Sequence, residues 1–151
     1  MSIDYKNPDL TQHPPRSPRA RLGGYVILPR AIDKARATLA GKSGEYHFNC
    51  PLDQRFFAFT GIKSEALLEQ LKAGLGDGEI LDWIKANSAA KPSPEEISKW
   101  SLENEHRVPN SEESKKKLEN DVKSIAPLRT DITEFFERLD LDDYVTFGGK
   151  A

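Results

Sequence analysis

The chain has 151 residues, a single cysteine and a formal net charge of −2 at neutral pH. This length fits one domain that needs neither disulfides nor metals to fold, and one cysteine excludes an intramolecular disulfide. A slightly acidic chain is also a poor general binder of nucleic acid. No apolar run approaches the roughly 20 residues needed to cross a bilayer, and residues 1–10 lack the features of a signal peptide. We therefore expect a cytoplasmic protein.

The charges are distributed unevenly along the chain. Residues 1–62 carry nine Lys and Arg against five Asp and Glu, a net +4, whereas residues 63–151 carry a net −6. Two parts of opposite charge either attract each other across the fold or leave a local basic face for an anion. Both interpretations stay open at the level of the sequence.

The first 18 residues predict an extended arm, because they contain four prolines and no periodic apolar pattern. The sequence RSPRAR follows at residues 16–21 and is succeeded by a glycine pair. Guanidinium groups suit phosphate or carboxylate oxygens, although these arginines equally suit pairing with the acidic second part of the chain. The candidate ligand-binding residues of this region are Arg16, Arg19, Arg21, Gly23, Gly24 and Tyr25.

Beyond the arm, apolar residues recur at helical spacing in about seven short segments. Ser, Asp, Pro and Gly occur where helix ends require them. The expected helices span residues 29–40, 51–60, 64–73, 77–89, 94–107, 110–126 and 130–139, and the tail that follows shows no clear pattern. Because strand signals are scarce, the sequence predicts an all-α fold, or a mainly α fold with a small extended pair. Residues 19–151 are expected to form one compact helical domain.

The first expected helix has one apolar stripe, which runs from Ile32 to Leu39. Its basic residues Arg30, Lys34 and Arg36 fall outside that stripe. They are therefore expected to face water or anions.

Residues 44–59, GEYHFNCPLDQRFFAF, concentrate the unusual side chains of the sequence, including its only cysteine. Proline is favoured in the first turn of a helix, so Pro51 predicts that Cys50 lies at a helix N-terminus. The partial positive charge there favours a thiolate. A catalytic hypothesis follows, in which Cys50 is the nucleophile, His47 the base and Arg55 the anion-stabilising group.

Other interpretations of this segment are available. A carboxylate at Asp53 opposes a thiolate, and the spacing of Cys50 and Arg55 matches the phosphatase loop only loosely. In the structural alternative, Cys50 is a small buried residue and Asp53 caps the helix start. His47, Cys50 and Asp53 are three conceivable metal ligands without a clear fourth, so the sequence predicts neither a metal site nor a cofactor.

Three strings, PPRSPRARLGGYVILPRAIDKARATLAGKSGEYHFNCPLDQRFF, DGEILDW and DLDDYVTFGGK, carry a family resemblance. They resemble an uncharacterised bacterial family, the domain-of-unknown-function family numbered five-zero-six-nine. The resemblance runs from about Asp9 to Lys150. It implies a stand-alone bacterial domain and brings no reaction, cofactor or catalytic residue with it.

The leading functional hypothesis is a small binding or interaction module. Its ligand is a small anion or an acidic protein partner, and its site is the surface shared by residues 16–25 and 47–55. The alternatives are a thiol-dependent enzyme that uses Cys50, and a structural subunit of a larger complex. The oligomeric state stays open.

Overall fold

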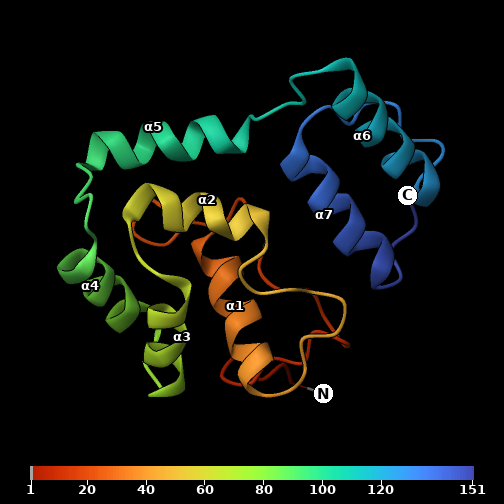
Figure 1. Ribbon diagram of the computed structural model, residues 1–151. Helices are drawn as coiled ribbons and strands as arrows, with labels where there is room; N and C mark the ends of the chain where they lie inside the picture. Colours follow the sequence, from red (N-terminus) through yellow and green to blue (C-terminus); the bar gives the residue numbers. More distant parts are fainter. Residues whose placement is uncertain (1) are drawn as a thin grey trace.

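The computed structural model describes residues 2–151, and over that range it contains seven α-helices and no strand (Figure 1). The all-α prediction is confirmed. The expected extended pair is reduced to one bridge between Leu22 and Tyr25. The helices are α1 (Leu28–Leu39), α2 (Pro51–Thr60), α3 (Ser64–Lys72), α4 (Asp77–Asn87), α5 (Pro94–Glu105), α6 (Glu112–Ile125) and α7 (Phe135–Thr146).

The start of α2 is confirmed, because Cys50 is its N-cap residue and Pro51 its first residue. The last helix differs from the prediction, since α7 begins at Phe135 rather than near residue 130 and continues to Thr146. The side chain of Glu137 accepts a hydrogen bond from the N–H of Glu134 at 3.0 Å, and this contact sets the later start.

Helix α1 lies at the centre of the fold, with α2 and α3 packed beside it (Figure 1). Nine of its twelve residues are buried. Its apolar side joins the main core with the aromatic side chains of α2, and Phe136 of α7 completes this core. Arg30 and Lys34 were expected to face water or anions; they do not face water, since they are only 4% and 3% exposed, and each pairs instead with a carboxylate of the chain. Leu39, expected on the apolar stripe, is 41% exposed.

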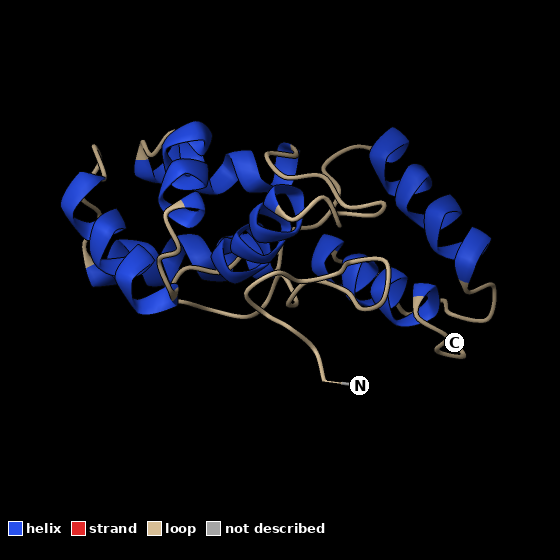
Figure 2. Ribbon diagram, turned by 90° about the horizontal axis from the view of Figure 1, so that it is seen from below, coloured by secondary structure: helices blue, strands red, loops and turns tan. Residues whose placement is uncertain are grey.

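Helices α6 and α7 lie beside the main body and form a second, smaller apolar cluster (Figure 1). Leu141 belongs to this cluster, whereas Phe136, just over one turn earlier in α7, belongs to the main core. Figure 2 shows loop segments between the helices of the main core and the α6–α7 pair. Helix α7 therefore connects two cores, and loop segments run between them.

The predicted arm, residues 1–18, contains no helix over the part that the structure describes, and Met1 lies outside the described residues. The arm packs against the domain: Leu10 is 1% exposed, and its N–H donates to the carbonyl oxygen of Lys42 at 2.9 Å. None of the helices over residues 2–151 is long and apolar enough to cross a membrane.

The packing of the main core predicts that two substitutions change the free energy of unfolding by very different amounts. Phe56 is fully buried and packs edge-on against Tyr25, so Phe56→Ala is expected to lower the free energy of unfolding by about 3–5 kcal/mol. Leu128 is 85% exposed, and Leu128→Ala is expected to change it by less than about 0.5 kcal/mol. Urea denaturation of the two variants measures both values. Equal effects would contradict the assigned core.

Candidate functional site

A cleft of about 610 Å³ lies where α1, the start of α2 and α7 meet. Basic side chains from α1, α7 and the loop after α5 line it, together with the loop that leads into α2. Glu45 and Asp142 are its acidic residues. The residues whose side chains bear on its chemistry are Arg30, Lys34, Tyr46, His47, Cys50, Arg107 and Arg138.

The sulfur of Cys50 lies against a buried ion pair. The Nζ atom of Lys34 is 2.9 Å from Oδ2 of Asp53 and donates to Sγ of Cys50 at 3.2 Å. The N–H of Asn49 donates to the same Asp53 oxygen at 2.9 Å, while Oδ1 of Asp53 is buried without a partner among the described residues. Asp53 therefore links the loop before α2 to the start of this helix and also holds the ammonium beside the sulfur. An ammonium group at this distance stabilises negative charge on sulfur.

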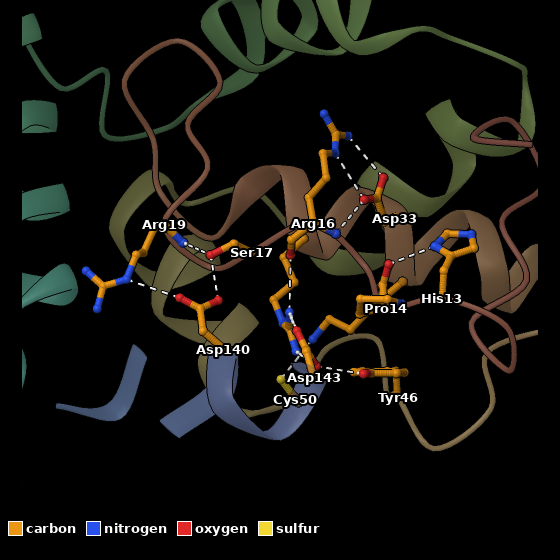
Figure 3. A network of polar contacts seen from close by, with 12 residues as sticks. His13, Pro14, Arg16, Ser17, Arg19, Asp33, Tyr46, Cys50, Asp140 and Asp143 are labelled. Atoms are coloured by element: carbon orange, nitrogen blue, oxygen red, sulfur yellow. Dashed lines mark hydrogen bonds and ion pairs between the residues drawn. The ribbon is translucent and has the colours of Figure 1, made fainter. Parts of the chain in front are cut away.

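A second buried group attaches the loop before α2 to α7. Arg30 donates from Nη1 to Oδ2 of Asp143 at 2.8 Å, and the hydroxyl of Tyr46 donates to Oδ1 of Asp143 at 2.6 Å (Figure 3). Burial and the hydrogen bond to Asp143 raise the pKa of Tyr46 above its usual range, so the phenol stays a proton donor. This contact fixes one wall of the cleft.

Arg107 and Arg138 form no ion pair with any residue in the described range. The guanidinium of Arg107 lies 4.1 Å from the centre of the Phe135 ring, and its buried Nε has no hydrogen-bond partner there. Burial, and then the charge of Arg55, lower the pKa of Arg107. The protein thus places an uncompensated, partly desolvated positive charge at the cleft.

Two of the three predicted catalytic residues, His47 and Cys50, line this cleft. Arg55 lines a different groove, beside Trp100. Its Nε donates to Oδ1 of Asn104 at 2.6 Å. The structure therefore brings together the proposed nucleophile and base, and places the predicted anion-stabilising arginine elsewhere.

The three arginines of residues 16–21 are all paired with carboxylates of the same chain. Arg16 binds Asp33 and Asp77 at 3.0 and 2.7 Å. Arg19 contacts Asp140 of α7 at 3.1 Å, and Ser17 donates to the same carboxylate (Figure 3).

The third of these arginines, Arg21, is also paired and contacts Glu105 at 3.1 Å. Burial lowers the pKa of Arg16, but its hydrogen bonds to Asp77 and Asp33 outweigh burial and raise it. These contacts agree with the alternative interpretation, in which the basic arm pairs with the acidic part of the chain.

The other candidate residues of this region, Gly23, Gly24 and Tyr25, form a tight turn outside the cleft. Gly23 and Gly24 have φ values of +59° and +85°, and a Cβ atom at Gly23 would collide with Leu81. Tyr25 is 3% exposed and packs edge-on against Phe56. The turn therefore packs against the main core and does not line the cleft.

Sequence reasoning missed Lys34, Tyr46, Arg107 and Arg138 as cleft residues. Lys34 follows Arg30 by one helical turn, and that spacing is the one signal in the sequence that places two cations on the same face. The other residues come from separate segments and meet only in the folded chain. Over residues 2–151, no three His, Cys, Asp or Glu side chains are arranged to hold a metal ion.

A family model described as a domain of unknown function, DUF5069, matches residues 12–145. The chain belongs to this family. The matched DUF5069 region contains every residue that lines the cleft except Thr146. No curated protein matches the chain.

The contacts of Asp77 in this DUF5069 chain predict a pH-dependent stability difference. Burial raises the pKa of Asp77, but hydrogen bonding and charge from Arg16 outweigh burial and lower it below its ordinary value. A carboxyl with a lowered pKa stabilises the fold above its unfolded pKa and loses this effect as the pH falls through its folded pKa.

Asp77→Asn is therefore expected to lower the free energy of unfolding at pH 7 by about 1 kcal/mol, allowing for the screening of a side chain that is one-third exposed. The difference from the unsubstituted chain is expected to shrink as the pH falls below about 4, the ordinary pKa of an aspartic acid, and urea denaturation at several pH values measures it. Asp82→Asn, on the exposed side of α4, is the control. A difference that stays constant with pH would contradict the assigned pairing.

Proposed function

We propose that this chain binds a small anionic ligand in the cleft between α2 and α7. The observation that carries the proposal is that Arg107 and Arg138 line this cleft without a carboxylate partner in the described range. The lowered pKa of Arg107 supports it, because a bound anion would relieve the positive and desolvated surroundings of that guanidinium. An arginine fork also matches phosphate and carboxylate oxygens.

The first turn of α2 supports the same ligand. Cys50, Pro51 and Leu52 line the cleft, and Pro51 has no N–H, so the N–H groups of Leu52 and Asp53 are the orphan donors of that turn. A helix N-terminus favours an anion through these donors and through its partial positive charge. His47, on the loop before α2, adds a further donor.

The lining also indicates what else the ligand carries. Leu52, Phe135 and Leu139 add apolar surface, while Glu45 and Asp142 limit the positive charge of the cleft. A ligand with one anionic group and a small apolar part fits this combination better than a polyanion. A single acidic side chain of a protein partner offers the same chemistry, and at about 610 Å³ the cleft has room for either.

Binding is expected to depend on the two unpaired arginines. Titration calorimetry with phenyl phosphate and with inorganic phosphate is expected to show saturable binding, tighter for phenyl phosphate because of its apolar ring. The double substitution Arg107→Gln and Arg138→Gln is expected to weaken binding at least about tenfold, since each removes charge-assisted hydrogen bonds.

Arg129→Gln is the matched control, because it makes the same chemical change at an exposed arginine that is paired with Asp131 outside the cleft. Equal weakening in this control would show non-specific attraction. Absence of saturable binding in the unsubstituted chain would overturn the proposal.

A thiol-dependent enzyme is the second candidate, favoured by the contact of 3.2 Å between Lys34 Nζ and Cys50 Sγ. In this function Cys50 is the nucleophile and His47 the base. Arg107 and Arg138 take the anion-stabilising role, because Arg55 lies in a different groove. A structural subunit of a larger complex is the third candidate and is recognised by co-purification of a stable partner.

The thiol function predicts fast alkylation of the folded chain. Iodoacetamide is expected to label Cys50 at neutral pH without denaturant. Lys34→Met is expected to slow labelling about tenfold, because the ammonium that stabilises the thiolate is lost. Cys50→Ser is expected to abolish both the labelling and any turnover of a p-nitrophenyl ester while leaving the circular dichroism spectrum unchanged. If labelling requires denaturant, the thiol of Cys50 is inaccessible in the folded chain and cannot be the nucleophile.

A further inference from the structure

We propose that Cys50 and Lys34 form a reversible covalent nitrogen–sulfur bond, a sulfenamide, when a hydroperoxide oxidises the thiolate. This modification is independent of the proposed ligand. It rests on the direct contact of a partly exposed thiol with a buried lysine amine, in a chain that has no second thiol.

The first step is the oxidation of Cys50 by the hydroperoxide, and both the exposure of the thiol and the neighbouring ammonium favour it. The thiol is half-buried and lines the cleft, so a small hydroperoxide reaches it. The Lys34 ammonium stabilises the thiolate, which is the form that peroxides oxidise. The thiolate attacks the terminal peroxide oxygen, so that an S–O bond forms and the O–O bond breaks. Lys34 gives a proton to the departing oxygen, which leaves as water or an alcohol.

In the second step, the sulfenic acid of Cys50 reacts with the amine of Lys34, which is in contact with the sulfur. A sulfenic acid is normally captured by a second thiol, but the sequence contains only one cysteine. Lys34 is now a neutral amine in contact with the sulfur, and its 3% exposure shows that it has little freedom to move away. Its nitrogen attacks the sulfur, the N–S bond forms and the S–O bond breaks. Hydroxide leaves and takes a proton from nitrogen, so the second product is water.

The two steps together need no oxidant other than the hydroperoxide. Sulfur loses two electrons, which reduce the O–O bond of the hydroperoxide. A small-molecule dithiol reverses the reaction, because it reduces the N–S bond and returns the thiol and the amine. The cross-link joins α1 to the start of α2 and removes one positive charge from the cleft. It also leaves Asp53 without its ammonium partner, which favours the return to the reduced form.

Mass spectrometry of the intact chain tests this inference. One equivalent of hydrogen peroxide is expected to give a product about 2 Da lighter than the reduced chain, which resists alkylation under denaturing conditions. Dithiothreitol is expected to restore the original mass. Peptide mapping of the unsubstituted chain is expected to find the peptides that contain Lys34 and Cys50 joined, with no tryptic cleavage after Lys34.

Two substitutions separate the cross-link from ordinary oxidation. Lys34→Met is expected to abolish the lighter product and to give a chain about 16 Da heavier, or a higher oxide, which dimedone traps at the sulfenic acid stage. Lys42→Met removes an exposed lysine and is expected to leave the cross-link intact. Peptide mapping of the unsubstituted chain keeps the test valid if Lys34→Met does not fold. Heavier products alone in the unsubstituted chain, or no change in its mass, would overturn the inference.

Discussion

The structure depends on the charged residues that α1 buries. Arg30 binds Asp143 of α7, Asp33 binds Arg16 of the arm, and Lys34 binds Asp53 of α2. A buried charge that loses its partner costs about 3–5 kcal/mol, so each pair holds a different segment against the central helix. The apolar side of α1 makes the core, and its charged side determines where the arm, α2 and α7 are placed.

The same ion pairs determine the shape of the cleft. Lys34 holds the start of α2, and Arg30 acts through Asp143 to hold both α7 and the loop that carries Tyr46. The contact between the main core and the α6–α7 pair is otherwise largely polar, apart from Phe136 and Leu139. A polar junction of this kind leaves space between two cores, and the cleft occupies that space. Charges that are paired within the fold thus lie beside Arg107 and Arg138, which have no carboxylate partner among residues 2–151.

Most of the helices were predictable from the sequence because their start and stop signals are local. Pro51 after Cys50, and Ser93 before Pro94, mark helix starts that depend on neighbouring residues alone. The burial of Arg30 and Lys34 was not predictable in this way, because hydrophobic periodicity assigns a charged residue to water. The carboxylate that keeps Arg30 buried lies 113 residues further along the chain. The cleft, assembled from α1, the start of α2, two loops and α7, is non-local for the same reason.

Asp53 illustrates how a tertiary contact reverses a conclusion drawn from proximity in sequence. A carboxylate three residues after Cys50 repels a thiolate, and on that ground it weighs against a reactive cysteine. In the folded chain the ammonium of Lys34 contacts both groups, at 2.9 Å from the Asp53 oxygen and 3.2 Å from the sulfur. The carboxylate therefore acts on the sulfur mainly through the cation that it positions. Asp53 therefore positions Lys34, and the thiol chemistry proposed for Cys50 depends on that pair as a unit.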